Sequence, residues 1–124
     1  MGSHPLNLTL RFILELSALF AYGYWGFTLK DGWLGILLAV FLPIGAAAIW
    51  GIFAVPADPS RSGKAPVPIA GSTRFVLELI FFGLASWAYL DAGFQWIGIL
   101  FAVLVIFHYL FSLDRINWLL RGDL

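Results

Sequence analysis

Two stretches of this chain contain no charged residue over a length that can cross a lipid bilayer. They are residues 32–56 and 92–113, and a membrane-spanning helix needs about 20 mostly apolar residues. Two further stretches, residues 8–29 and 72–90, are apolar apart from one Arg and one Glu near the start of each. Because backbone polar groups must be satisfied within each segment in lipid, the four stretches predict four transmembrane helices.

The composition supports a membrane protein. Of the 124 residues, 61% are hydrophobic and 11% are charged, and the mean hydropathy is +0.92. Soluble domains are about one quarter charged, and a chain this short could not bury so much apolar surface in water. Seven basic and seven acidic residues give no net charge, which argues against a nucleic-acid partner, and the absence of Cys excludes disulfides and thiol chemistry.

The chain contains an internal repeat at an offset of 63 residues. Residues 11, 12 and 14–16 are identical to 74, 75 and 77–79, and residues 33, 35–37, 39 and 40 are identical to 96, 98–100, 102 and 103. Apolar bias does not explain the paired Arg, Glu and Trp among these eleven identities. Each copy crosses twice, so both have the same orientation. The prediction is an all-α, four-transmembrane-helix bundle of two tandem hairpins related by a pseudo-twofold axis along the membrane normal.

The predicted organisation has five parts. Residues 1–7 form a tag remnant and N-terminal tail, 8–55 the first transmembrane hairpin, 56–70 a Pro-rich linker, 71–113 the second hairpin, and 114–124 an amphipathic interfacial tail. Only Lys30 is basic on the face of the hairpin turns, whereas six basic residues lie on the face of the termini and linker, namely Arg11, Arg61, Lys64, Arg74, Arg115 and Arg121. This bias predicts that both termini and the linker are cytoplasmic.

A polar layer is predicted in the cytoplasmic half of the bundle. Within each of two helices, an Arg and a Glu four residues apart share one face and can pair. Each Glu lies about 9 Å inside its span, and one Trp and one His of the other two helices lie about as deep. Charged groups in hydrocarbon normally face the bundle interior. The candidate layer comprises Arg11, Glu15, Trp50, Arg74, Glu78 and His108.

The role of this layer has three interpretations. The first is structural: Arg and Glu neutralise each other and fix the packing of the two copies. The second is a proton relay, or a small-anion or headgroup site, and the third is that the Arg side chains only reach toward the interface. His108 is a packing residue or, alternatively, a ligand or proton acceptor. The helices lack the Glu-x-x-His spacing of di-iron bundles, and the chain lacks nucleophile, phosphate-loop and cofactor motifs, so no metal, cofactor or catalytic residue is predicted.

Small residues predict helix contacts, and one Pro predicts a kink. Equivalent small-xxx-small pairs occur in the two copies, and one further pair occurs in the second helix. The six predicted contact residues are Gly35, Ala39, Ala47, Gly51, Gly98 and Ala102. Pro43 has no counterpart in the second copy, and it should kink the second helix and free a backbone carbonyl.

Several segments resemble the YrdB-like family of small bacterial membrane proteins, a family defined by a domain of unknown function. The resemblance rests on residues 10–16, 23–26, Pro43 with 46–56, and the second Glu-Leu segment at Glu78. It would cover nearly the whole chain. It implies a bacterial multi-pass protein of the inner membrane, and it implies no activity.

The leading functional hypothesis is a non-enzymatic structural or assembly protein, which packs with itself or with another membrane protein. One alternative is a proton-coupled transporter or channel subunit, which would need to oligomerise because four helices are few for a pathway. Another is a lipid- or quinone-binding membrane protein that uses the aromatic end of the bundle. Membrane lipids are the expected surroundings in every case.

Overall fold

The computed structural model describes residues 4–58 and 65–121, and these residues form five α-helices and two short strands. The elements are α1 (Pro5–Leu29), α2 (Gly32–Ile52), β1 (Phe53–Ala54), β2 (Val67–Pro68), α3 (Gly71–Asp91), α4 (Gln95–Leu110) and α5 (Leu113–Arg121). Most of the expected tag remnant lies outside the described residues, as do Arg61, Lys64 and the last three residues of the tail.

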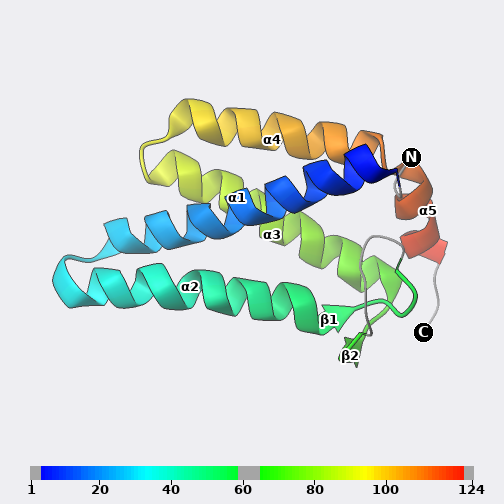
Figure 1. Cartoon of the computed structure of the whole chain (residues 1–124), viewed down its shortest axis with the longest axis horizontal. Helices are drawn as coiled ribbons and strands as arrows, with labels where there is room; N and C mark the ends of the chain where they lie inside the picture. The colour runs from blue at the N-terminus through cyan, green and yellow to red at the C-terminus, as the bar shows by residue number, and fades with distance from the viewer. Residues whose placement is uncertain (1–3, 59–64, 122–124) are drawn as a thin grey trace.

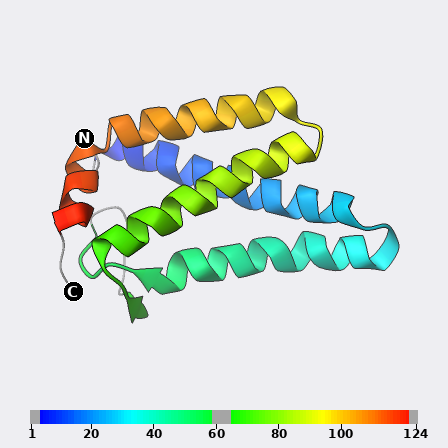
Figure 2. The ribbon, with the colours of Figure 1, turned by 180° about the vertical axis from the view of Figure 1, so that it is seen from behind.

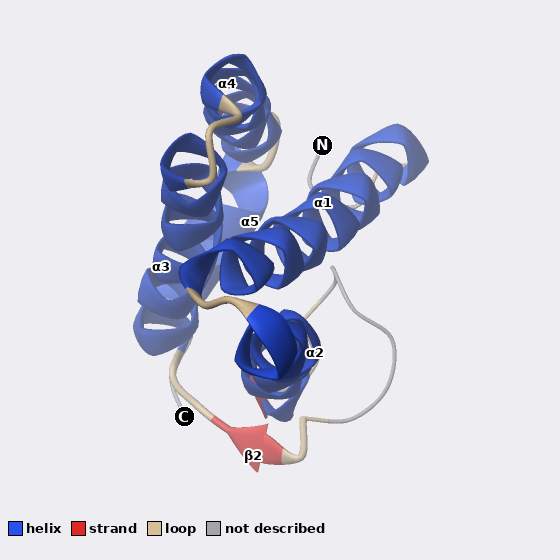
Figure 3. Ribbon diagram, turned by 90° about the vertical axis from the view of Figure 1, so that its left-hand side faces the viewer, coloured by secondary structure: helices blue, strands red, loops and turns tan. Residues whose placement is uncertain are grey.

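Helices α1 and α3 cross at the centre of the molecule (Figure 1). Helix α2 packs on α1 and helix α4 packs on α3, so α2 and α4 lie on opposite sides of the crossing pair (Figure 2). The view along the long axis separates α2 from α4 in the same way (Figure 3). Both hairpin turns lie at one end of this axis, and the start of α1, the two strands and α5 lie at the other (Figure 1).

Glycine in the left-handed backbone region forms part of both hairpin turns. Gly32 has a φ of +68° between α1 and α2, and Gly93 has a φ of +98° between α3 and α4. Residues with a Cβ rarely adopt this conformation. The first helix begins at Pro5, whose missing N–H is tolerated in a first turn, and the His4 side chain accepts a hydrogen bond from the Leu6 N–H at 3.2 Å.

Among the described residues, three helices are individually long and apolar enough to cross a membrane, namely α1, α2 and α3. Helix α4 has only 16 residues, about 24 Å at 1.5 Å per residue, and α5 follows it after a bend of 70°. Helix α4 therefore ends at Leu110, three residues before the end of the fourth uncharged stretch at residue 113. At the bend, the Ser112 hydroxyl donates to the His108 carbonyl oxygen at 2.8 Å, an interaction that competes with continued helix.

A strand pair connects the end of the second predicted span to the linker: β1 lies within that span, and β2 lies in the segment predicted as a loop. Strands β1 and β2 are parallel, with Phe53 opposite Val67 and Ala54 opposite Pro68. The Ile69 N–H also donates to the Ala54 carbonyl oxygen at 2.8 Å. These bonds join the end of α2 to the approach to α3. Strands of two residues leave almost no periodic signal in a sequence, which is why the pattern of Pro and Gly predicted only a loop.

Alanine lets α1 and α3 approach closely where they cross. Ala18 and Ala21 of α1 and Ala85 and Ala88 of α3 are at most 1% exposed and belong to one core cluster with Leu14. Small residues allow helix backbones to come together even where the surroundings are apolar. The two alanines of each helix are three residues apart, whereas the small-xxx-small pairs in the sequence prediction are four residues apart.

Some of the predicted contact glycines are buried close to neighbouring backbone. A Cβ on Gly35 would lie 2.3 Å from the Lys30 carbonyl oxygen, so a larger residue would disturb the first hairpin turn. A Cβ on Gly98 would lie 3.0 Å from the Ser86 carbonyl oxygen and closer still to the Leu90 side chain.

The remaining predicted contact residues lie in different surroundings. The Ala39 carbonyl oxygen approaches Gly23 of α1, where a Cβ would lie 3.2 Å from it, and α2 continues through Pro43, whose ring lies nearby. Ala102 is half-buried in α4. Ala47 is exposed, and a Cβ on Gly51 would meet no atom of the described chain within 4 Å.

The outer surfaces of the helices are strongly apolar. Trp96 is 82% exposed, Trp33 is 68% exposed and Phe41 is 62% exposed. In α2, Gly35 is the only residue that is fully buried among the described residues. An apolar surface of this extent on a protein normally marks contact with a membrane or with another protein.

Candidate functional site

The carboxylate of Glu78 lies at the centre of a buried group of charges. Glu78 belongs to α3, and its side chain has 0% exposure. Four side chains donate hydrogen bonds to it, namely the guanidinium groups of Arg11, Arg74 and Arg115 and the hydroxyl of Tyr109. We call these five residues the Glu78 cluster.

The members of the Glu78 cluster come from four helices. Arg11 of α1 donates to Oε2 of Glu78 at 2.9 Å, and Arg74, one turn earlier on α3, donates to the same oxygen at 2.8 Å. Arg115 of α5 donates to both carboxylate oxygens, at 2.9 and 2.7 Å, and Tyr109 of α4 donates at 2.7 Å. Charge-assisted and bidentate hydrogen bonds are the strongest in proteins. One carboxylate therefore joins α1, α3, α4 and α5.

Asp58 connects the linker to the Glu78 cluster. It is 5% exposed and accepts hydrogen bonds from Nε and Nη2 of Arg115, at 3.0 and 2.6 Å. Burial alone would lower the pKa of Arg115, but hydrogen bonds from its guanidinium to Glu78 and Asp58 outweigh burial and raise that pKa above its ordinary value. The preceding residue, Ala57, has a φ of +64°, a costly conformation for a residue with a Cβ.

His108 extends the network toward the start of α1. Nη1 of Arg11 lies 3.3 Å from Nε2 of His108, and a guanidinium can only donate. Nε2 therefore accepts, and the proton of the neutral ring is on Nδ1, which donates to the Asn7 side-chain oxygen at 3.0 Å. The Asn7 amide in turn donates to the Ser112 hydroxyl at 2.7 Å. In this arrangement His108 is a neutral, hydrogen-bonded packing residue.

Trp50 connects α2 to the same charges. The guanidinium carbons of Arg11 and Arg74 lie 5.0 and 4.3 Å from the centre of its ring, within the range of cation–π attraction. Arg74 also donates to the carbonyl oxygens of Trp50 and Phe53, each at 2.6 Å, and so satisfies carbonyl groups at the end of α2. The indole N–H of Trp50 donates to Glu15 of α1.

Within the residues that the structure describes, the formal charges of this network cancel. Its guanidinium groups belong to Arg11, Arg74 and Arg115, and its carboxylates belong to Glu15, Asp58 and Glu78. A buried charge is tolerated only when it is paired and hydrogen-bonded. A neutral network with donors on every buried carboxylate meets this condition, and removing one member would break it.

The structure brings together all six residues of the predicted layer. Arg74 and Glu78 pair along α3 at 2.8 Å, as their spacing of four predicts. Arg11, by contrast, donates across the molecule to Glu78 as well as lying near His108. The two copies of the repeat are therefore joined by an ion pair between them.

Five further polar residues belong to the network but were not predicted, namely Asn7, Asp58, Tyr109, Ser112 and Arg115. Asp58 and Arg115 lie in the linker and the tail, outside the apolar stretches, where charged residues are usually solvated. The sequence offered two signals for these residues: an acidic residue shortly after a span, and a basic residue in an amphipathic tail. Neither of these two signals predicts a buried partner, because the contact depends on the bend between α4 and α5, which the sequence pattern does not specify.

Among the described residues, no group of three His, Asp or Glu side chains is positioned to hold a metal ion. The acidic groups of the network instead face guanidinium groups, which compete with a cation for the same oxygens. The network is suited to holding helices together.

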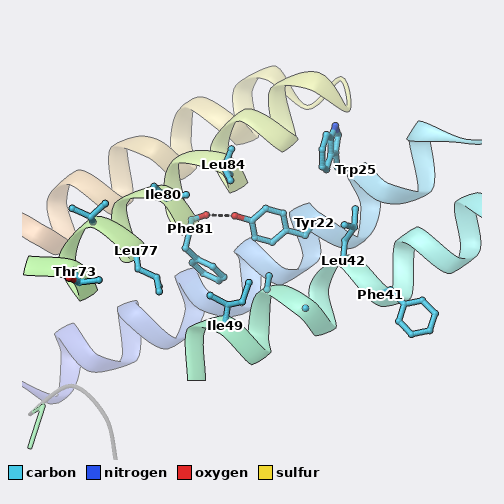
Figure 4. Close-up of a pocket in the computed structure, with 13 residues that line it drawn as sticks. Tyr22, Trp25, Phe41, Leu42, Ile49, Thr73, Leu77, Ile80, Phe81 and Leu84 are labelled. Atoms are coloured by element: carbon cyan, nitrogen blue, oxygen red, sulfur yellow. Dashed lines mark hydrogen bonds between the residues drawn. The ribbon is translucent and has the colours of Figure 1, made fainter. Parts of the chain in front are cut away.

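A groove of about 640 Å³ runs between α1, α2 and α3, and its lining residues include none of the charged residues of the network. Its walls are almost entirely apolar, and Tyr22 donates a hydrogen bond to the Phe81 carbonyl oxygen along it (Figure 4). Gly45 and Ala46 form part of the α2 wall. At the repeat offset they correspond to His108 and Tyr109, so the second copy has large side chains where the first has almost none.

The fold and the network define a small, all-helical protein with apolar segments of membrane-spanning length and a buried ionic centre. The chain belongs to the DUF2568 family, whose description is a protein of unknown function and whose model matches residues 9–106. It is 41% identical over 115 residues to the uncharacterized protein YrdB of Bacillus subtilis (strain 168), covering 93% of this chain and 94% of that protein. The predicted resemblance to the YrdB-like family is confirmed. No solved structure matches the chain significantly.

Proposed function

We propose that this chain is a non-enzymatic scaffold of the bacterial cytoplasmic membrane, which crosses the bilayer four times and is held rigid by the Glu78 cluster. The observation that supports this role is the pairing of three buried guanidinium groups with buried carboxylates in the described part of the chain. Four helices and the linker donate to or accept from members of the buried network. Such a network fixes the relative positions of helices at the cost of adaptability.

The apolar exterior supports placement in a membrane. Large apolar side chains are exposed along α1, α2, α3 and α4, and lipid contact removes the cost of exposing them to water. Helix α5 bends 70° away from α4 and exposes Leu113 and Leu120. A short amphipathic helix at this angle is suited to lying along the membrane surface.

The two-hairpin repeat supports the proposed topology. At the offset of 63 residues, α1 corresponds to α3 and α2 to α4, and α1 and α3 cross centrally with α2 and α4 outside them (Figure 1). The excess of basic residues on the side of the termini and linker then orients that side toward the cytoplasm. The parts proposed for the chain are residues 8–55 and 71–113 as hairpins, 56–70 as a cytoplasmic linker and 114–124 as an interfacial tail.

Cysteine labelling tests this placement, because the chain has no Cys of its own. Asp31→Cys in the first hairpin turn should react with a membrane-impermeant maleimide in intact cells. Pro66→Cys, at an exposed position of the linker, should react only after the membrane is opened, and the unaltered chain should not react in either case. Reaction of the linker variant in intact cells, or recovery of the protein in the soluble fraction, would contradict the proposal.

The geometry favours this scaffold over a proton-coupled transporter built on Glu78. Glu78 has three guanidinium partners and a tyrosine hydroxyl, so protonating it would leave buried positive charges without a counter-charge. A carboxylate that must change its charge repeatedly is poorly placed in such surroundings.

A second candidate function, lipid binding, is favoured by the groove between α1, α2 and α3. Its apolar walls and its position along three spans suit an acyl chain of a membrane lipid. Thr73, in the first turn of α3, is the polar group at the end of the groove that we place near the cytoplasm. The small residues Gly45 and Ala46 leave this space open.

Filling the groove tests the lipid site. Ala46→Trp places a large side chain in the groove, whereas Ala47→Trp places the same side chain on the exposed neighbouring face. Protein carrying Ala46→Trp should lose most of the lipid that the unaltered protein retains in native mass spectrometry, and the Ala47→Trp control should keep it. Equal lipid retention in both variants would exclude the groove as a specific site.

A further inference from the structure

Glu15 and Glu78 occupy equivalent places in the repeat but have different surroundings. Glu78 is fully buried and accepts hydrogen bonds from three guanidinium groups. Glu15 is half-buried, and Trp50 donates to it with an uncharged indole N–H. Phe12, one turn earlier on α1, is 58% exposed, so Glu15 lies at the edge of the apolar exterior.

The charged groups that face Glu15 come from α1 and α3. Arg11 is one turn away on the same helix, Arg74 and Glu78 face it from α3, and Trp50 faces it from α2. Both arginines direct hydrogen bonds to Glu78, and Arg74 also donates to backbone carbonyl groups. These hydrogen bonds therefore favour the ionised form of Glu78. The same two arginines attract the Glu15 carboxylate only from a longer distance, so they stabilise its ionised form less.

We propose that Glu15 is the proton-binding site of this network, and that it takes up a proton while Glu78 remains ionised. The proton adds to one carboxylate oxygen of Glu15, and the other oxygen continues to accept from the Trp50 N–H. The formal charge of the described network then rises by one, and the added positive charge is shared among three guanidinium groups. Protonation is favourable for a carboxyl group at the edge of an apolar surface, because the charged form of the group is costly there.

This site goes beyond the scaffold role, which does not require Glu15 to change its charge. It also specifies a chemical reactivity. A protonated carboxyl in apolar surroundings gives its proton to a hydrophobic carbodiimide, the carboxylate then adds to the central carbon, and rearrangement leaves a stable N-acylurea that contains all atoms of both reactants. An ionised carboxylate held by guanidinium groups does not start this reaction.

The test is to treat the intact protein in detergent or liposomes with dicyclohexylcarbodiimide over a range of pH and to map the adduct by peptide mass spectrometry. We expect the adduct at Glu15, with labelling that increases as the pH falls. Above the pKa, each pH unit should lower the protonated fraction, and so the initial rate, about tenfold. Glu78 in the same sample is the internal control and should remain unlabelled until the protein is unfolded.

Because the adduct is mapped on the unaltered chain, the result does not depend on whether a variant folds. Glu15→Gln should remove the label, and Glu15→Asp should retain it. A label on Glu78 in the folded protein would overturn the proposal. So would a pH-independent label on Glu15, or an absence of label there at acidic pH when the same residue is labelled in the unfolded chain.

Discussion

Glu78→Gln is expected to be the most destabilising conservative substitution in this chain. The change removes one negative charge and keeps the volume of the side chain. Three buried guanidinium groups then share only the carboxylates of Asp58 and Glu15. Breaking a buried pair by removing one partner typically costs about 3–5 kcal/mol. Since Glu78 has three such partners, we expect a loss at or above the upper end of that range.

The measurement is the free energy of unfolding in detergent, with Glu15→Gln as the matched control. The control removes the same charge at the equivalent place in the repeat and should cost clearly less, because Glu15 is only half-buried. Combining Arg74→Leu with Glu78→Leu restores charge balance, and the double variant should be more stable than Glu78→Leu alone. Equal losses in the Glu15 and Glu78 variants would show that the Glu78 cluster does not hold the helices together.

Arg115→Gln is expected to have the next largest effect, and its effect should be concentrated at one end of the molecule. Arg115 makes two hydrogen bonds to Glu78 and two to Asp58. Its loss leaves both carboxylates with fewer donors, at a cost of about 3–5 kcal/mol for a buried pair. It also removes the hydrogen bonds that join α5 and the linker to α3, so both segments should open more often.

Hydrogen exchange measured by mass spectrometry should detect this opening. Amides of residues 113–121 and 54–58 should exchange faster in the variant, while the crossing region of α1 and α3 should be unchanged. Arg121→Gln removes an exposed arginine of the same helix and should leave exchange unaltered. Adding Asp58→Asn to Arg115→Gln restores charge balance and should recover part of the stability. Uniform acceleration along the whole chain would instead indicate global destabilisation without a specific link to α5.

The candidate site was predictable where it followed from helical periodicity. Arg74 and Glu78 are four residues apart, and the 63-residue offset points to Arg11 and Glu15. Equal depth in their spans identified Trp50 and His108 as their neighbours. In each case the prediction depends only on rise per residue and on the cost of charge in an apolar core. The all-helical fold and the apolar segments followed from composition in the same way.

The remaining features depend on contacts that sequence periodicity does not encode. Arg115 reaches Glu78 because the chain bends 70° after α4, and a tail of mixed charge and apolar residues does not specify that direction. Asp58 is buried where the linker meets Arg115 of α5, and an acidic residue in a Pro-rich segment does not indicate that partner. The hydrogen bond from Arg11 to Glu78 of the other copy depends on the crossing of α1 and α3.

The long separation between the partners has a consequence for biosynthesis. Arg11 and the Glu78 that accepts its hydrogen bond are 67 residues apart. At synthesis rates of about 5–20 residues per second, Arg11 precedes that carboxylate by about 3 to 13 seconds. A first hairpin that enters the proposed membrane during this interval carries a guanidinium group without its final partner. Early pairing with Glu15, one turn away on the same nascent helix, would lower the cost of that step before the second hairpin arrives.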